Sequence, residues 1–410
     1  MKNLKGRAVF AQSGGPTAVI NSSIAGGLIE ALKSEQITDV LCAIHGIKGV
    51  IDEDFVDIGK EDLDELYALK NTPASAFGSV RYKLKDFEKD DTDYKRILEV
   101  FKKYDIRYFF YNGGNDSMDT CDKISRFMEK EGYPVNVIGI PKTIDNDLVG
   151  TDHCPGYGSA AKYIATTVSE VRLDAIIYES PLVIVLEIMG RNAGWLTAAS
   201  ALASVTGYGA DLIYLPEVPF SMDKFKSDVK RVVDKNRVCI VAVSEGIKTA
   251  DGKYVGEDAS ATDVFGHSAL GGVCGVLKSA VKSMGIKCKA IELNILQRCA
   301  THCASKTDIE ESFESGRQAV IHAVNGETDK MIAFKRKDGK DYQIECVGLN
   351  LLSIANAEKT VPLEWITEDG TGLKKEFFDY ALPLIQGEPE IRRENGLTSY
   401  AKLKMIPFKI

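Results

Sequence analysis

Short apolar runs alternate with longer amphipathic stretches through most of the chain, and this alternation constrains the fold more than any other feature. The runs predicted as strands are brief and rich in β-branched or aromatic residues: 8–12, 107–111, 135–140, 182–188, 211–215 and 238–243. The stretches predicted as helices are 18–33, 93–104, 118–130, 159–176, 192–204, 222–234 and 268–283. Strands that alternate with helices in this way form mainly parallel sheets covered by helices. We therefore predict an α/β fold.

The length, the charge and the cysteine content of the chain limit the kind of protein it can be. A chain of 410 residues is too long for one typical core and suits two α/β domains. The 51 basic and 59 acidic residues give a net charge of −8, which argues against nucleic acid as the main partner. No apolar run approaches the roughly 20 residues that span a bilayer, and the N-terminus lacks the apolar region of a signal peptide. The nine scattered cysteines suit reduced thiols, so we expect a cytoplasmic protein.

Two glycine-rich segments lie between a predicted strand and a predicted helix. They are 12–17 (Gln-Ser-Gly-Gly-Pro-Thr) and 111–117 (Tyr-Asn-Gly-Gly-Asn-Asp-Ser). In open parallel sheets, ligands bind beyond the carboxyl ends of the strands. Gly14 and Gly15 would let backbone N–H groups approach a phosphate at a helix N-terminus, although an ordinary turn fits equally well. Asp116 could cap a helix or face a ligand or its metal ion.

The segment 139–147 (Gly-Ile-Pro-Lys-Thr-Ile-Asp-Asn-Asp) carries the strongest chemical signal. Two carboxylates, Asp145 and Asp147, follow an apolar strand, and Lys142 precedes them. Phosphoryl transfer to an alcohol needs one carboxylate to take the hydroxyl proton, one to hold Mg²⁺, and a cation to meet the charge on the transferring group. A solvated turn is the plainer interpretation of the same residues.

Several basic residues could bind anions. Arg191 closes the apolar strand 182–188, and Arg81 and Lys83 would share one side of an extended segment. Arg298, near the end of the strand that contains Lys289, is a further candidate. Each residue alone is more often a solvated surface charge, so only their combination favours a binding site.

Other motifs lack the context that they need. Residues 156–161 fit the dinucleotide pattern G-x-G-x-x-A but follow a polar segment instead of a strand, and no P-loop or G-x-S-x-G motif is present. Cys299, His302 and Cys303 lie close together, but no second ligand pair has zinc-finger spacing. A small cluster on a helix is the better interpretation.

Taken together, these segments resemble the 6-phosphofructokinase superfamily. The motifs at 13–15, 113–117, 141–147 and 189–191 come in the order found in that family, and the third is highly specific. The resemblance runs from about Val9 to at least Arg298 and on to 383–391. It implies two Rossmann-like three-layer (αβα) domains: residues 1–155 plus about 298–350 for the phosphoryl donor and Mg²⁺, and residues 156–297 plus about 351–410 for the sugar phosphate.

The resemblance also implies a role for each site residue. The groups with a catalytic role would be Asp145 as general base, Lys142, Asp116 and Arg81. The donor would be bound by Gly14, Gly15, Lys83 and Lys142, and Mg²⁺ by Asn115 and Asp147. The sugar phosphate would be bound by Thr143, Ile144, Asp145, Met189, Gly190, Arg191, Glu245, Lys289 and Arg298.

The donor is decided by two positions. ATP-using members of the family carry glycine where this chain has Asp116, and usually glycine where it has Lys142. An aspartate fills the space of the α-phosphate with bulk and negative charge, and a lysine supplies a cation to a leaving group that lacks the nucleotide. The resemblance therefore points to the pyrophosphate-dependent branch.

Three departures from the family pattern affect the other ligands. Many relatives have aspartate where this chain has Asn115, and a neutral amide is a weaker Mg²⁺ ligand. The segment 180–183 lacks an arginine that often reaches a neighbouring subunit, and Ile295 replaces a common histidine. The predicted sugar-phosphate site is thus less complete than the phosphoryl-transfer centre.

We expect reversible transfer from pyrophosphate to the 1-hydroxyl of fructose 6-phosphate by a homodimer or homotetramer. An ATP-dependent enzyme or a sedoheptulose 7-phosphate kinase of the same fold is the nearest alternative. A non-catalytic regulatory subunit that binds sugar phosphate is an alternative of another class. Such subunits tend to lose the acidic pair, which is present here as Asp145 and Asp147.

Overall fold

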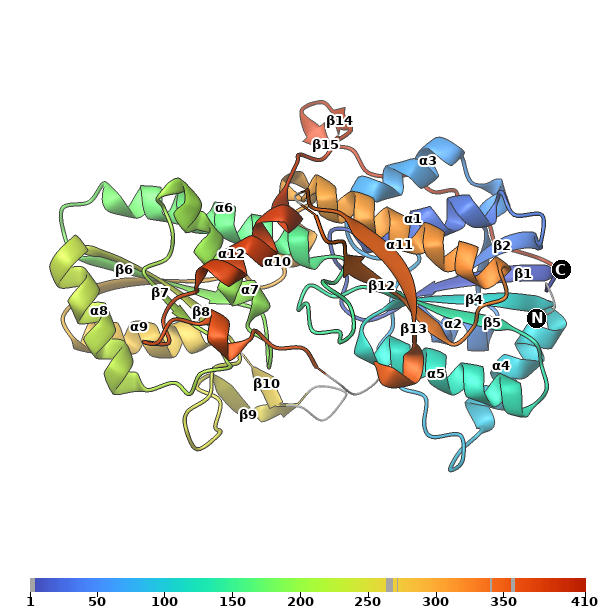
Figure 1. Cartoon of the computed structure of the whole chain (residues 1–410), viewed down its shortest axis with the longest axis horizontal. Coiled ribbons are helices and arrows are strands. Elements are labelled where there is room, and N and C mark those ends of the chain that lie inside the picture. The colour runs from blue at the N-terminus through green and yellow to red at the C-terminus, as the bar shows by residue number, and fades with distance from the viewer. Residues whose placement is uncertain (1–3, 263–267, 271, 340, 355–357) are drawn as a thin grey trace.

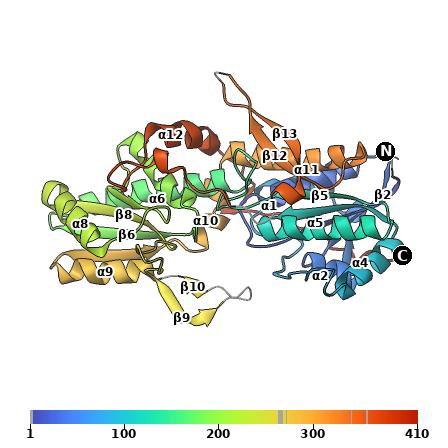
Figure 2. The same cartoon turned by 60° about the horizontal axis from the view of Figure 1, so that its bottom comes forward.

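The computed structural model describes residues 4–262, 268–270, 272–339, 341–354 and 358–410. Two lobes lie side by side, each built around its own β-sheet with helices on both faces (Figure 1). Figure 2 shows the β12–β13 hairpin projecting from the first lobe and the β9–β10 hairpin from the second. The predicted α/β fold with two three-layer units is confirmed.

The first lobe is organised by a seven-stranded sheet in the order β13-β12-β5-β4-β1-β2-β3. Its inner strands are parallel, and the edge strands β13 and β3 run antiparallel to their neighbours. The strands are β1 (Gly6–Gln12), β2 (Ile37–Ala43), β3 (Phe55–Asp57), β4 (Ile106–Gly113), β5 (Asn136–Pro141), β12 (Lys330–Arg336) and β13 (Ile344–Asn350). The carboxyl ends of β1, β4 and β5 therefore meet at one edge, where the glycine-rich segments begin.

The second lobe contains a four-stranded parallel sheet in the order β11-β6-β8-β7. Its strands are β6 (Leu182–Ile188), β7 (Leu212–Tyr214), β8 (Val238–Ser244) and β11 (Lys287–Glu292). β6 and β8 are buried along their whole length, which explains why both are almost continuously apolar, with Glu187 as the charged exception in β6. Two small hairpins complete the described strands: β9 (Glu257–Thr262) with β10 (Ser268–Leu270), and β14 (Arg393–Glu394) with β15 (Leu397–Thr398).

Helices cover both faces of each sheet. In the first lobe these are α1 (Ile20–Ala31), α2 (Ile47–Asp52), α3 (Leu63–Ala68), α4 (Thr92–Lys103), α5 (Asn115–Lys130) and α11 (Lys306–Val324). In the second lobe they are α6 (Tyr157–Ile176), α7 (Trp195–Ala198), α8 (Met222–Asn236), α9 (Val273–Ser283), α10 (Leu296–Cys299) and α12 (Lys375–Ala381). Separate apolar clusters fill the space on each side, with α4 and α5 on one face of the first sheet and α1 and α11 on the other. No helix among the described residues is long and apolar enough to cross a membrane.

The predicted elements needed correction at two places. The predicted helix 268–283 begins only at Val273, because residues 268–270 form strand β10. The predicted helix 192–204 is a short α-helix, α7, followed by a 3₁₀ stretch at Ala199–Thr206. The predicted strands and helices also do not include seven elements of the first lobe: β2, β3, β12, β13, α2, α3 and α11.

The chain passes between the lobes more than once. After the second lobe it returns to build α11, β12 and β13 against the first sheet, and α12 then packs in the core of the second lobe. The expected division assigned all of 351–410 to the second domain. The last residues instead contact the first lobe: the Phe408 N–H donates to the Phe55 carbonyl at 2.8 Å, and Pro407 forms a bridge with Val56.

Helices α1 and α11 approach each other so closely that only glycine fits at their contact. A Cβ atom on Gly316 would lie 1.7 Å from the Ser23 carbonyl oxygen, and one on Gly26 would lie 1.9 Å from the Phe313 carbonyl oxygen. Both neighbours are backbone atoms, so a side chain can be accommodated only if the helices move apart. This contact joins residues nearly 300 positions apart in the sequence (Figure 1).

We predict that Gly316→Ala lowers the free energy of unfolding by about 3 kcal/mol, because the added methyl group overpacks a rigid helix contact. Gly275→Ala is the matched control, since Gly275 is an exposed position within α9 where an added Cβ meets nothing within 4 Å. That variant should be neutral or more stable by about 0.5–1 kcal/mol. Thermal and urea unfolding measure both effects, and equal stability of the two variants would contradict the prediction.

Candidate active site

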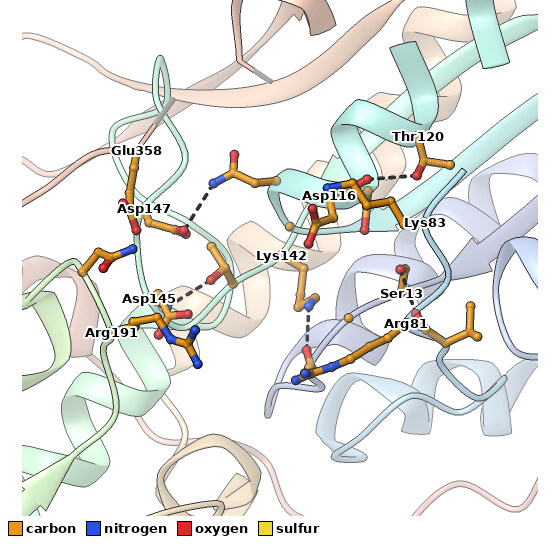
Figure 3. Close-up of a pocket in the computed structure, with 18 of the residues that line it drawn as sticks. Ser13, Arg81, Lys83, Asp116, Thr120, Lys142, Asp145, Asp147, Arg191 and Glu358 are labelled. Carbon is orange, nitrogen blue, oxygen red and sulfur yellow. Dashed lines mark hydrogen bonds between the residues drawn. The ribbon is translucent and has the colours of Figure 1, made fainter. Parts of the chain in front are cut away.

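A cavity of about 470 Å³ lies where the two lobes face each other. The first lobe supplies the turns after β1, β4 and β5 and the segment 80–83, and the second lobe supplies the turn after β6. The residues that line the cavity are Ser13, Gly14, Gly15, Val80, Arg81, Tyr82, Lys83, Gly114, Asn115, Asp116, Ser117, Thr120, Lys142, Thr143, Asp145, Asp147, Arg191, Asn192, Tyr254 and Glu358. Most of the predicted site residues are therefore brought together here (Figure 3).

The turn after β1 brings its backbone close to two cationic groups. Gly14 has a φ of 78°, and a Cβ at this position would lie 3.3 Å from Lys142 Nζ. A Cβ on Gly15 would lie 3.1 Å from Arg298 Nη1. The glycines thus leave room for cations beside the turn, as a site for phosphate requires.

Lys142 is buried between this turn and the two acidic residues of the cavity. Its Nζ atom donates a hydrogen bond to the Gly15 carbonyl at 2.6 Å (Figure 3). Burial lowers the pKa of Lys142 to about 8, although the charges of Asp145 and Asp147 oppose this shift. The ammonium group therefore stays mostly protonated near neutral pH and places a positive charge beside the glycine turn.

Asp145 and Asp147 stand on a tight turn after β5. Burial raises the pKa of Asp145 to about 7, with further contributions from the charges of Asp147 and Glu245. Asn146, between the two acids, is fully buried and has a left-handed φ of 56°. Its side chain donates to the Tyr380 hydroxyl at 2.8 Å and accepts from the Cys154 N–H at 2.9 Å. The turn is thus fixed by the residue that points away from the cavity.

Asn115 and Asp147 present oxygen atoms that lack protein donors. Asn115 Nδ2 donates to Asp147 Oδ2 at 3.3 Å (Figure 3). Within the described part of the chain, Asn115 Oδ1 and Asp147 Oδ1 are buried and accept no hydrogen bond. Buried acceptors without donors are costly, and amide and carboxylate oxygens are ligands that Mg²⁺ prefers. The donor set therefore fits a hard divalent cation.

Asp116 lies in the first turn of α5 and is exposed to the cavity. Figure 3 shows Asp116, Lys83 and Lys142 on one part of the wall, and Asp145, Asp147 and Arg191 on another. Arg81 and Lys83 both reach the cavity, as their alternation along an extended segment predicts.

The remaining predicted residues lie outside the cavity wall. Ile144 belongs to the core of the second lobe, and Met189 packs against that core. Glu245 accepts a hydrogen bond from the Gly190 N–H at 3.1 Å and so lies directly behind the turn that presents Arg191. Arg298 Nη1 lies close to Gly15, as described above, but Arg298 does not line the cavity.

Lys289 does not line the cavity either. It lies in the middle of β11, where its Nζ atom is 3.8 Å from Asp174 Oδ2 and 5.7 Å from the centroid of the Tyr178 ring. Tyr254 and Glu358, by contrast, line the cavity without having been predicted. Neither lies in a recognisable motif, and only the three-dimensional fold brings them to the site.

A buried ionic cluster supports the loop that follows the acidic turn. His153 is 1% exposed, with Nδ1 2.8 Å from Asp152 Oδ1 and Nε2 2.8 Å from Glu311 Oε2. Arg336 from β12 donates to the same Asp152 oxygen at 2.9 Å. Burial alone would lower the pKa of His153, but hydrogen bonds with both carboxylates outweigh it and raise the pKa above the usual value. The cluster ties the loop to α11 and β12.

Comparisons with known proteins agree with the geometry of the site. Residues 7–320 match the family described as Phosphofructokinase. The chain is 46% identical over 402 residues to a pyrophosphate–fructose 6-phosphate 1-phosphotransferase of Halomonas elongata, with 97% of this chain and 96% of the relative covered. A relative of the same name from Methylococcus capsulatus is 44% identical over 401 residues, covering 97% of this chain and 95% of that protein.

Solved structures of phosphofructokinases are also similar to this chain. The chain resembles the crystal structure of a pyrophosphate-dependent phosphofructokinase from Nitrosospira multiformis with a TM-score of 0.90 and 41% identity, over 99% of this chain and 98% of that one. The phosphofructokinase of Pichia pastoris, at 19% identity and a TM-score of 0.67 over 86% of this chain and 38% of that one, is similar in fold.

We predict that His153→Gln destabilises the protein by about 3 kcal/mol in mildly acidic solution, where a buried ion pair is broken. Because the pKa of His153 is raised in the folded state, its stabilisation is fully present below the ordinary value of 6.5 and is lost as pH rises through the raised value. The difference in melting temperature from the native sequence should therefore shrink as pH rises. His302→Gln, at an exposed position, should show no such trend. A difference independent of pH would contradict the prediction.

Proposed function

Because this chain belongs to the phosphofructokinase family, we propose that it transfers a phosphoryl group reversibly from pyrophosphate to the 1-hydroxyl of fructose 6-phosphate, giving fructose 1,6-bisphosphate and phosphate. The observation that carries this proposal is the position of Asp116 and Lys142 on the wall of a cavity that also holds Asp145. The names of the full-length relatives point to the same donor and acceptor.

Pyrophosphate would bind beside the turn after β1. Gly14 and Gly15 leave the backbone open to the donor phosphates, and Lys142 and Lys83 supply positive charge. Asp116 would exclude a nucleotide by occupying the position that its α-phosphate needs. Arg81 would stabilise the charge on the transferring group.

Asp145 would accept the proton of the sugar 1-hydroxyl as that oxygen attacks the phosphorus. Its burial suits this role, because a raised pKa lets a carboxylate act as a base near neutral pH. Thr143 accepts a hydrogen bond from the Asp145 N–H at 3.1 Å and would contact the same substrate. The sugar phosphate would lie toward the second lobe, with the following residues as ligands or supports: Ile144, Met189, Gly190, Arg191, Glu245, Lys289 and Arg298.

Mg²⁺ would be held by Asn115 and Asp147, whose buried oxygens without donors fit such an ion. When bound, the ion would supply positive charge to the donor phosphates. We further propose a cytoplasmic homodimer or homotetramer. All nine cysteines are free, as suits a reducing compartment. Light scattering of the purified protein tests the assembly.

The donor assignment is tested with fructose 6-phosphate and either pyrophosphate or ATP as the only donor, with fructose 1,6-bisphosphate measured by coupled aldolase. We predict turnover with pyrophosphate and little with ATP. The double variant Asp116→Gly, Lys142→Gly should gain ATP binding and use, because the space and charge that exclude the nucleotide are removed.

Better turnover with ATP than with pyrophosphate would overturn the donor assignment. If the double variant does not measurably bind ATP, the steric explanation for ATP exclusion is wrong, but the assignment of pyrophosphate as the donor still stands. Sedoheptulose 7-phosphate in the same assay tests the acceptor, and activity of the chain purified alone excludes a purely regulatory subunit.

We predict that Asp145→Asn lowers turnover by about 10²–10⁴-fold while fructose 6-phosphate binding, measured by calorimetry, is retained. The native activity should also fall as pH drops below the pKa of Asp145 near 7, since only the carboxylate accepts a proton. Asp64→Asn, at an exposed position of α3, is the matched control and should leave both quantities unchanged. Near-normal turnover of Asp145→Asn would rule this residue out as the base.

A further inference from the structure

Glu358 adds a third carboxylate to the cavity from a part of the chain beyond the matched family region. It lines the same cavity as Asp145 and Asp147, and Figure 3 shows its side chain beside that of Asp147. The family match ends at residue 320, so none of the motifs discussed above includes this glutamate.

The backbone next to Glu358 is held firmly against the acidic turn. The Lys359 N–H donates to the Asp147 carbonyl at 2.7 Å. The Lys359 carbonyl accepts from Trp195 Nε1 at 2.9 Å, and Lys359 Nζ donates to the Asp152 carbonyl at 2.8 Å. Hydrogen bonds to the N–H, the carbonyl and the side chain of Lys359 fix this residue in place. They therefore also fix the backbone of Glu358, the residue before it, in the cavity wall.

The electrostatics of this corner favour a bound cation. Asp145, Asp147 and Glu358 place three carboxylates on the wall of one cavity, and Figure 3 shows the Glu358 and Asp147 side chains next to each other. Like charges grouped in this way repel one another. The oxygens Asn115 Oδ1 and Asp147 Oδ1, described above, are buried there and accept no hydrogen bond within the described residues. A divalent cation would satisfy both oxygens and relieve the repulsion.

We propose that Glu358 is a third residue of the divalent-cation site and supplies the negative charge that the neutral Asn115 side chain does not. This inference rests on the proposed cation site at Asn115 and Asp147. A residue from the C-terminal third of the chain would then contribute directly to metal binding in the cavity. The simpler role for Glu358 is a hydrogen bond with Asn192, which the experiment must separate from cation binding.

The test measures binding of Mn²⁺, a spectroscopic substitute for Mg²⁺, by the electron paramagnetic resonance signal of the free ion. The full-length protein is titrated alone and with methylenediphosphonate, a non-hydrolysable analogue of pyrophosphate. Glu358→Gln retains the size of the side chain and its ability to bond with Asn192 but removes the charge. We expect it to raise the Mn²⁺ dissociation constant about tenfold or more, the range found when groups that support metal ligands are changed.

Two further variants make the result specific. Glu358→Asp keeps the charge and should bind Mn²⁺ more tightly than Glu358→Gln. Glu364→Gln, at an exposed position six residues farther along, removes the same charge from the same region and should bind as the native protein does. Unchanged melting temperatures would show that the variants are folded.

The outcomes separate this inference from the proposal beneath it. If Asp147→Asn weakens Mn²⁺ binding and Glu358→Gln does not, Glu358 is not part of the site, although the site itself stands. If the native protein binds no Mn²⁺ in either titration, or if neither variant weakens binding, the cation site at Asn115 and Asp147 is wrong as well. If Glu364→Gln weakens Mn²⁺ binding as much as Glu358→Gln does, the effect comes from the net charge of the protein. That result would overturn the role of Glu358.

Discussion

Charged groups of both signs are held away from water in the central cavity, and the surrounding structure depends on keeping them there. Lys142 lies buried between the Gly15 carbonyl and two carboxylates, and Asp145 and Asp147 stand two residues apart on one turn. In a poorly solvated site, such charges interact far more strongly than in water, so small displacements change the electrostatic energy greatly. The positions of these charged side chains must therefore be fixed by groups outside the cavity, and the structure contains several such groups.

These supporting groups come from distant parts of the chain. Tyr380 of α12 accepts from the Asn146 side chain and donates to the Asp152 carbonyl at 2.8 Å. Lys359 donates hydrogen bonds to the carbonyls of Asp147 and Asp152, at the two ends of the same loop. His153 connects this loop to α11 through Glu311. The acidic turn is thus fixed where the two lobes meet, so its geometry is linked to their relative position. A substrate bound across the cavity would be held against a preorganised centre.

Sequence patterns predicted what local physics determines. The mostly apolar strand 182–188 and the glycine-rich turns at 12–17 and 111–117 correctly predicted strand ends from which residues that line the cavity follow. Tyr254, Glu358 and the support from Tyr380 could not be predicted, because no local pattern marks a side chain that acts through distant contacts. The same holds for α11, whose Gly316 would weaken a helix prediction but serves its packing against α1. The roles of Glu245 and Lys289 rested on the family resemblance alone, and their separation from the cavity wall depends on the fold.

The position of β12 has a consequence for how the protein is synthesised. β12 pairs with β5, yet its residues follow those of β5 by almost 200 positions, after the whole strand set of the second lobe. During translation the free edge of β5 must wait while the second lobe emerges from the ribosome. A lone parallel edge of this kind is a template for pairing with other chains. The order of the strands therefore exposes the nascent first lobe to misassembly until its last inner strand is made.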